Sequence, residues 1–255
     1  MFLINAVVVT FSLFCICESA YVDTLTKCSI KDNECLKGLY QKVLQDAQNG
    51  IPELDILPLD PLHLQDVGVN ILDALVLTIT DGVAKGMSKC VFNKFSFDVD
   101  NHKGRLDATC DVITVKAHFN VAGESPLLQT IVGGINVNGE GKAKLRLEKV
   151  NLTVEYQMYP HKINDEIYLY ISNKDLKYSY DVGNAHVTTE NIIIGNNDIS
   201  DLVSLYFNAN WRQLLKSYGS LFIDKTFEIF ISRIQKFCDG VAANKYISDD
   251  LSPYV

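Results

Sequence analysis

The run of sequence that decides the fold is ISDLVSLYFNANWRQLLKSYGSLFIDKTFEIFISRIQKFCDG, residues 199–240. Its large apolar side chains return every three or four positions and no proline interrupts them, so the run predicts one continuous helix. At 1.5 Å per residue, this helix is about 60 Å long. Exposing so many aromatic side chains to water would cost too much free energy, so other structure must cover the helix.

The cover is predicted from residues 69–194, where the apolar pattern alternates. Residues 113–121 place apolar and polar side chains in strict alternation, as a strand does when one face is buried and the other faces water. A second long strand is expected over residues 144–159, and its alternation changes phase near Lys149, which a β-bulge would explain. Strands this long on a bent path indicate a strongly curved antiparallel sheet. Turns are expected at residues 101–104, 122–124, 138–139 and 173–175.

A short amphipathic helix is predicted near the beginning of the chain, from Cys35 to a stop at Asn49-Gly50. The segment after it, residues 51–62, holds three of the six prolines and is expected to be extended. The sequence contains no Ser-, Gly- or Pro-rich linker and no internal repeat. We therefore expect residues 21–255 to form one elongated α+β domain.

The first twenty residues predict a secretory signal peptide. An apolar run over residues 2–17 is followed by small residues, with a cut after Ala20 or, about as well, after Ser19. An uncleaved membrane anchor is the alternative, which we disfavour because the run is short for a membrane span. Cleavage removes two of the seven cysteines and leaves 7 − 2 = 5 in a chain exported to an oxidising compartment.

Export makes two covalent modifications plausible. Cys28 and Cys35 close a short loop, and a disulfide there would pin the first segment to the short helix. Asn151-Leu152-Thr153 is the one glycosylation sequon of the mature chain, and Asn151 lies on the polar face of its predicted strand. Sequons within strands are often left unmodified, so both outcomes stay open for Asn151.

The pairing of the other three cysteines is less certain from the sequence. In an ideal hairpin that turns at residues 101–104, Cys90 faces Val115, five residues away from Cys110. That offset is too large for the Cα separation that a disulfide requires. Cys238 lies near the end of the long helix. We therefore favour buried free thiols over a second disulfide for Cys90, Cys110 and Cys238.

Composition indicates a globular protein that does not bind nucleic acid. Hydrophobic residues make up 47% of the 255 residues, and charged residues make up 21%. The formal net charge is −8, from 23 basic and 31 acidic residues. Contacts to phosphates need clustered Lys and Arg, so nucleic acid is excluded as the main partner.

The sequence carries no recognisable catalytic or metal-binding motif. The five histidines are scattered, and no pair has the i, i+4 spacing of a helix-borne zinc site. There is no G-x-S-x-G elbow, and no P-loop spacing follows the glycines. We therefore expect no metal, no cofactor and no enzymatic activity. A triad assembled from distant residues, as in an esterase, stays open as an alternative.

Several motifs together resemble one protein family. They are the paired Cys28 and Cys35, the proline-spaced GIPEL (50–54) and LPLDPL (57–62), FNANW (207–211) and the tail NKYISDDL (244–251). In this order they are similar to the insect takeout and haemolymph juvenile-hormone-binding proteins, and the likeness covers the whole mature chain.

The resemblance implies a long helix wrapped by a curved sheet, similar to one half of the tubular lipid-binding proteins of the bactericidal/permeability-increasing type. It also implies a tunnel for a hydrophobic ligand, which is juvenile hormone in one branch and another terpenoid or fatty compound in takeout-like branches. The hormone binders commonly have a second disulfide between the later strands and the last helix. Only Cys238 lies in that region here, so a takeout-like carrier fits better.

The leading hypothesis is a secreted, non-enzymatic carrier of a small hydrophobic molecule, with no stable insertion into membranes. Its cavity would lie between the long helix and the inward strand faces, because ligand sites are mostly apolar with a few polar tips. The competing hypothesis is a protein-interaction or signalling module with a filled core and an exposed apolar patch. In that case the candidate ligand contacts simply fill a solid core. These candidates are Trp211, Leu214, Leu215, Tyr218, Phe222, Phe119 and Tyr156.

Overall fold

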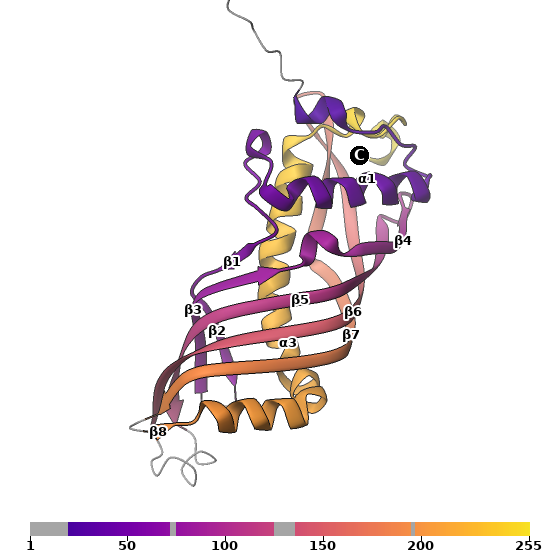
Figure 1. Ribbon diagram of the computed structural model, residues 1–255. Coiled ribbons are helices and arrows are strands. Elements are labelled where there is room, and N and C mark those ends of the chain that lie inside the picture. Colours follow the sequence, from indigo (N-terminus) through magenta and orange to yellow (C-terminus); the bar gives the residue numbers. More distant parts are fainter. Residues whose placement is uncertain (1–19, 72–74, 125–135, 195–196) are drawn as a thin grey trace, which may run out of the picture.

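The computed structural model describes residues 20–71, 75–124, 136–194 and 197–255 (Figure 1). All of the predicted signal peptide except Ala20 therefore lies outside the described residues. Eight strands form one antiparallel sheet in the order β1-β3-β5-β6-β7-β8, while β2 also pairs with β3 and β4 with β5. The strands are β1 (Leu62–Leu64), β2 (Val67–Ile71), β3 (Leu75–Lys85), β4 (Val91–Asp98), β5 (Lys103–Glu124), β6 (Asn136–Ile163), β7 (Glu166–Ile194) and β8 (Asn197–Asp198). The helices are α1 (Asn33–Asp46) and α3 (Ser200–Gly240), with short 3₁₀ turns at Tyr21–Thr24, Ala47–Asn49, Pro52–Leu54, Met87–Lys89, Ala243–Lys245 and Ser252–Tyr254.

The predicted long helix is confirmed as α3, which continues without interruption for 41 residues. Figure 1 shows that it is bent: its first part runs along one end of the curved sheet, and its later part crosses the strands toward α1. Gly/Ser pairs are a common cause of helix bends, and Gly219-Ser220 stands in the middle of α3. Gly219 is buried against the sheet, where an added Cβ would come within 2.3 Å of the Tyr180 hydroxyl. That hydroxyl donates instead to the Leu215 carbonyl at 2.7 Å.

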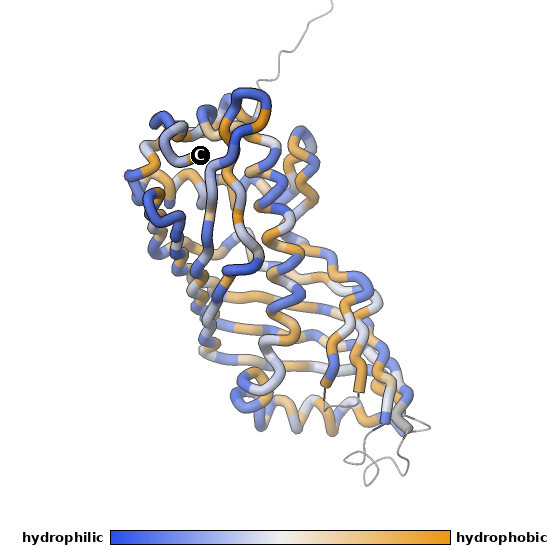
Figure 2. The backbone as a smooth tube through the Cα atoms, turned by 180° about the vertical axis from the view of Figure 1, so that it is seen from behind, coloured by the Kyte–Doolittle hydropathy of each residue, from blue (hydrophilic) through white to orange (hydrophobic). Residues whose placement is uncertain are grey.

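The curved antiparallel sheet is also confirmed, and the later part of α3 lies across its strands when viewed from behind (Figure 2). The expected change of phase near Lys149 occurs, but the expected β-bulge is wrong. The pairing of β5 with β6, and of β6 with β7, keeps the same register on both sides of Lys149. Lys149 instead has a left-handed backbone, with φ of 53°. The inward side chains change parity at this level in all three strands, so β5, β6 and β7 bend together.

Three of the expected turns lie inside strands. Residues 122–124 are the last residues of β5, residues 138–139 belong to β6, and residues 173–175 belong to β7. In β7 the four residues 173–176 stand opposite the single residue Tyr156 of β6, so the turn-like sequence marks a wide bulge. The chain reverses instead at Asn164-Asp165, two residues whose positive φ values of 47° and 69° suit a two-residue hairpin.

The predicted short helix begins two residues earlier than expected, because the Asp32 side chain accepts a hydrogen bond from the Cys35 N–H at 3.0 Å and caps it. It passes into a 3₁₀ turn, which ends at Gly50 (φ 84°). The first half of the proline-spaced segment that follows is not extended as expected: Pro52–Leu54 form a 3₁₀ turn, Asp55 is left-handed (φ 52°), and two backbone hydrogen bonds between Ile51 and Ile56 close the loop. The expected disulfide between Cys28 and Cys35 is present, with 5.6 Å between the two Cα atoms.

A second disulfide joins Cys90 to Cys110, so the expectation of free thiols is wrong for this pair. The hairpin between β4 and β5 turns at residues 99–102, two residues earlier than the assumed 101–104, since Asp98 pairs with Lys103. A bulge at Asn93 shifts the register by one more residue. Together these two changes bring the cysteines opposite each other, with 4.2 Å between their Cα atoms.

The free edge of β7 is covered by side chains of α3 that bond to its backbone. The Asn208 amide accepts from the Val187 N–H at 2.8 Å and donates to the Val187 carbonyl at 2.9 Å, as a neighbouring strand would. Near the other end of α3, the Gln235 carbonyl oxygen accepts from the Ile171 N–H at 3.0 Å. Near the start of α3, two serine hydroxyls also accept hydrogen bonds from backbone N–H groups of β7. The Ser204 hydroxyl accepts from Thr189, and the Ser200 hydroxyl accepts from Ile192.

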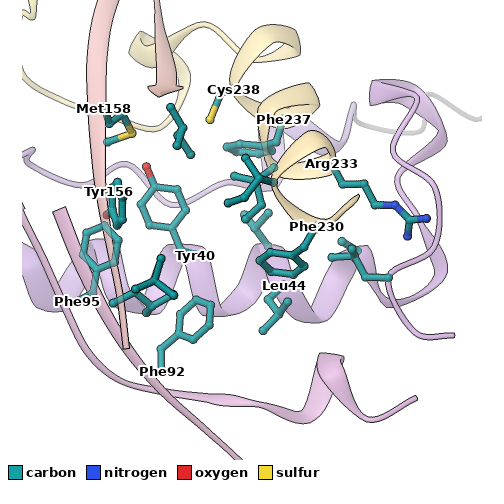
Figure 3. A pocket seen from close by; sticks show the side chains of 18 of the residues that line it. Tyr40, Leu44, Phe92, Phe95, Tyr156, Met158, Phe230, Arg233, Phe237 and Cys238 are labelled. Carbon is teal, nitrogen blue, oxygen red and sulfur yellow. The ribbon is translucent and has the colours of Figure 1, made fainter. Parts of the chain in front are cut away.

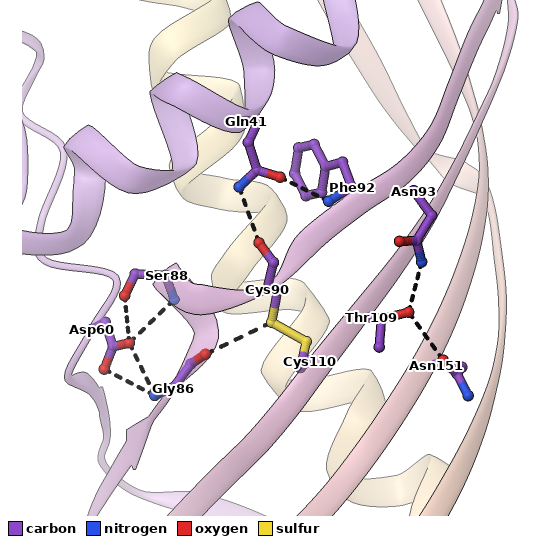
Figure 4. Close-up of a disulfide and its surroundings, with 10 residues drawn as sticks. All are labelled: Gln41, Asp60, Gly86, Ser88, Cys90, Phe92, Asn93, Thr109, Cys110 and Asn151. Carbon is purple, nitrogen blue, oxygen red and sulfur yellow. Dashed lines mark hydrogen bonds between the residues drawn. A yellow bond between two sulfur atoms is a disulfide. The ribbon is translucent and has the colours of Figure 1, made fainter.

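The free edge of β4 is covered by α1 through the same chemistry. The Gln41 amide donates to the Cys90 carbonyl at 3.0 Å and accepts from the Phe92 N–H at 2.7 Å (Figure 4). Asn33 accepts from the Phe97 N–H at 2.9 Å. Since unpaired backbone groups of an edge strand are costly to bury, these amides hold both helices in place along the sheet.

Replacing Asn208 with alanine tests this edge pairing. The change removes two hydrogen bonds and leaves the Val187 N–H without a partner, so we expect the free energy of unfolding to fall by about 1–3 kcal/mol in urea titrations. Asn210→Ala is the matched control, because among the residues that the structure describes the Asn210 amide bonds only to the Tyr206 carbonyl of its own helix. Its expected loss is under about 0.5 kcal/mol. Equal losses for the two variants would contradict the edge pairing.

Candidate functional site

An apolar cavity lies between α1, the last turns of α3 and the strands that face them (Figure 3). The centre of a water molecule can occupy about 120 Å³ of it. A single water needs only roughly 10–15 Å³ on the same measure, so the cavity is larger than a packing void by about tenfold. It lies within the larger of the two core clusters, at the end of the molecule that holds α1.

Two helices supply most of one side of the cavity. In α1 and the turn after it, the lining residues recur with helical spacing at Tyr40, Val43, Leu44 and Ala47. In α3 the same spacing brings in Phe230, Ile231, Ile234, Phe237 and Cys238. The amphipathic faces predicted from the sequence thus meet across the cavity instead of packing directly on each other.

Four strands supply the opposite side, with Phe92 and Phe95 from β4, Leu106 from β5, Val154, Tyr156 and Met158 from β6, and Ile171 and Leu176 from β7. The bulge in β7 matters here, because it spans residues 173–176 and so ends on a lining residue. The ring of Phe95 lies between two tyrosines, with its centroid 5.1 Å from that of Tyr40 and 6.4 Å from that of Tyr156.

Apart from Arg233, whose guanidinium is charged, the titratable groups in the cavity wall are neutral at physiological pH. Burial raises the pKa of Tyr40 and of Tyr156, and the charge of a Cys238 thiolate would raise both further. Burial, with a smaller contribution from the charge of Asp239, raises the pKa of the Cys238 thiol to about 12. Cys238 is a buried free cysteine, as the sequence analysis favoured. These groups offer hydrogen bonds to a ligand but no ionised nucleophile.

The structure places the predicted ligand contacts in two regions. Tyr156 lines the cavity. The other six, Trp211, Leu214, Leu215, Tyr218, Phe222 and Phe119, are half-buried elsewhere along α3 and β5 and do not line it. The guanidinium of Arg212 lies 4.3 Å from the centre of the Trp211 ring. Whether any of these six residues contacts a ligand stays a prediction.

Sequence reasoning missed most of the lining residues. Those of α1 and of residues 230–238 were recognisable as apolar helix faces, but the pattern did not show that the two faces stand apart. Arg233, which also lines the cavity, was a visible irregularity within the second face. The bulge that brings in Leu176 had a turn-like signal that suggested the end of a strand.

The predicted glycosylation site lies away from the cavity. Asn151 is exposed on β6, and its side-chain oxygen accepts from the Thr109 hydroxyl at 3.0 Å, which in turn accepts from the Asn93 amide at 2.6 Å (Figure 4). The exposed amide of Asn151 suits a glycan, whose attachment stays a prediction.

Across residues 20–71, 75–124, 136–194 and 197–255, no helix has the length and apolar character of a membrane span. Within the same ranges, no three His, Cys, Asp or Glu side chains come together as metal ligands would.

Comparison with known proteins now places the chain in a family. The model of the haemolymph juvenile hormone binding protein family matches residues 6–248. The chain belongs to this family. Among curated relatives, it is 21% identical over 218 residues to the circadian clock-controlled protein daywake of Drosophila melanogaster, covering 77% of this chain and 76% of that protein.

Among solved structures, the fold matches that of Takeout 1 from Epiphyas postvittana, with a TM-score of 0.75 and 21% identity over 88% of this chain and all of that one. The resemblance to the takeout and juvenile-hormone-binding family, and the fold predicted with it, are thus confirmed. A lipopolysaccharide binding protein matches with a TM-score of 0.39 and 12% identity, over 81% of this chain and 38% of that one. That score is too low to support a comparison of folds.

The buried thiol gives a direct test of how closed this end of the molecule is. Only the thiolate reacts with Ellman's reagent, and a pKa of about 12 in place of 9.0 lowers the thiolate fraction at pH 8 by roughly a thousandfold. We therefore expect the native protein to be labelled at Cys238 at least a thousandfold more slowly than the protein in guanidinium chloride. Rapid labelling of one thiol in the native protein would contradict the described burial.

Proposed function

We propose that the protein is a secreted carrier that binds one small hydrophobic molecule in the cavity between α1, α3 and the curved sheet. The observation that carries this proposal is an almost wholly apolar cavity lined by residues of the larger core cluster. Membership of a family described as juvenile hormone binding proteins supports it. The ligand would be a terpenoid, such as juvenile hormone, or a fatty compound.

The hydrophobic effect supplies a large part of the free energy that such a role needs. Removing about 300 Å² of apolar ligand surface from water yields roughly 7 kcal/mol before the cost of association. This is close to what micromolar binding requires. The hydroxyls of Tyr40 and Tyr156 add hydrogen-bond donors that can orient a ligand within an apolar wall.

Export from the cell is part of the proposal. The apolar run over residues 2–17 and the small residues that follow it fit a cleaved signal peptide, which would leave residues 21–255 as the mature domain. Two disulfides suit an oxidising compartment. The description of the family places its members in haemolymph.

A protein-interaction function is a second candidate, favoured by one observation. Leu202, Leu205 and Tyr206 form an apolar stripe on the first part of α3 and are 50%, 70% and 61% exposed. Such stripes often mark binding surfaces. An esterase has less support, because no hydrogen bond joins a serine hydroxyl to a histidine among the residues that the structure describes.

A filled-cavity variant tests where the ligand binds. Leu176 lines the cavity from the β7 bulge, so an indole in its place would occupy the vacant space. We expect Leu176→Trp to weaken binding of the apolar fluorophore N-phenyl-1-naphthylamine at least tenfold in a fluorescence titration. Circular dichroism would confirm that the variant folds, because overpacking a core usually costs only about 1–3 kcal/mol.

Leu214→Trp is the matched variant, since it makes the same change at a half-buried position of α3 that does not line the cavity. It should leave the affinity for the fluorophore within twofold of the wild type. If Leu214→Trp weakens binding and Leu176→Trp does not, the ligand binds beside the α3 residues predicted from the sequence. No saturable binding by the wild-type protein would argue against a carrier altogether.

A further inference from the structure

One charged side chain interrupts the apolar wall of the cavity. Arg233 projects from α3 between Phe230 and Phe237, and its aliphatic stem lines the cavity together with those rings. Figure 3 shows its guanidinium at the outer end of the side chain, away from the group formed by Tyr40, Tyr156 and Met158. The charge therefore lies at the rim of the cavity, on the side of α3.

The guanidinium has almost no compensation for its partial burial. Arg233 is half-buried, and its Nη1 donates to the Pro58 carbonyl. None of the ion pairs within the described ranges involves it. Burial lowers its pKa, and no nearby carboxylate offsets that effect.

The neighbouring Lys236, by contrast, has a carboxylate partner. Lys236, one turn further along α3, forms an ion pair with Asp55 and also donates to the Asp55 carbonyl at 2.9 Å. Lys236 thus holds the segment that leads into β1, independently of the bond from Arg233 to Pro58.

A half-desolvated cation without a counter-ion is costly, so proteins usually pair such groups. The guanidinium carries five N–H donors in a planar fork, and only one nitrogen of Arg233 has a partner within the described structure. That fork matches a carboxylate, which can accept two parallel hydrogen bonds from it. An anionic head group next to an apolar cavity describes a fatty acid.

We propose that Arg233 binds the carboxylate of a single-chain fatty acid whose hydrocarbon tail occupies the cavity. This inference rests on the proposed function and narrows it from hydrophobic molecules in general to amphipathic carboxylates. The arrangement places the charge at the rim, where water still reaches it, and places the tail against rings and aliphatic side chains. The tyrosines and Cys238 of the inner wall are neutral, so they add no negative charge that would repel a carboxylate.

The test compares dodecanoic acid with methyl dodecanoate, which keeps the tail and removes the charge. Both are measured by displacement of N-phenyl-1-naphthylamine at pH 8. We expect the wild type to prefer the acid by about tenfold. Arg233→Gln should weaken binding of the acid about tenfold and leave binding of the ester within twofold, so that the preference disappears. Arg233→Lys should keep part of the preference, because it keeps the charge.

Lys236→Gln is the control, since it removes an equally close charge that already has a carboxylate partner. It should leave the preference for the acid unchanged. Equal affinities of the wild type for acid and ester would overturn the proposal while leaving a carrier of neutral ligands in place. An Arg233→Gln variant that loses acid and ester equally would also overturn it, because that result assigns Arg233 to holding the Pro58 segment. If the fluorophore itself does not bind to the wild type, the proposed carrier function is contradicted as well.

Discussion

The fold depends on how its sheet edges are closed. A curved sheet that does not form a complete barrel leaves backbone groups unpaired along its outer strands, and these groups must find partners where they are buried. Here the partners are side chains on helices: Asn208 of α3 pairs with Val187 on β7, and Gln41 of α1 pairs with the backbone on both sides of Val91 in β4. These bonds fix the helices along the sheet and so set the distance between them.

That distance explains why a cavity exists where the two helices approach the same strands. Each helix is held by its own strand edge, so neither can move inward to fill the space between them. The β7 bulge opposite Tyr156 widens the wall, and large rings such as Phe95 and Phe237 keep the opposing surfaces apart. Elsewhere the sheet packs against α3, but at this end part of its apolar face borders the cavity. That uncovered apolar face is the physical basis for binding an apolar molecule.

Much of the fold was accessible from the sequence, and most of the site was not. Uninterrupted helical periodicity over residues 199–240 and strict alternation over residues 113–121 required a long helix and a half-buried sheet, and both are present. Strand registers were harder to predict, because a single bulge at Asn93 and a turn two residues earlier than expected placed Cys90 opposite Cys110. Periodicity shows which side chains point inward, but it does not show which inward face lacks a partner. For that reason Tyr156 is the one predicted ligand contact that lines this cavity, whereas the other six lie elsewhere.

A crystal structure of the protein grown with 1-bromododecane, whose bromine locates the bound molecule by anomalous scattering, tests most directly whether the cavity binds an apolar molecule. We expect one ordered molecule inside the cavity, with its bromine peak and chain density between Tyr40 and Phe237. A cavity that remains empty at saturating hydrocarbon, or density found instead beside Trp211, would contradict binding in this cavity.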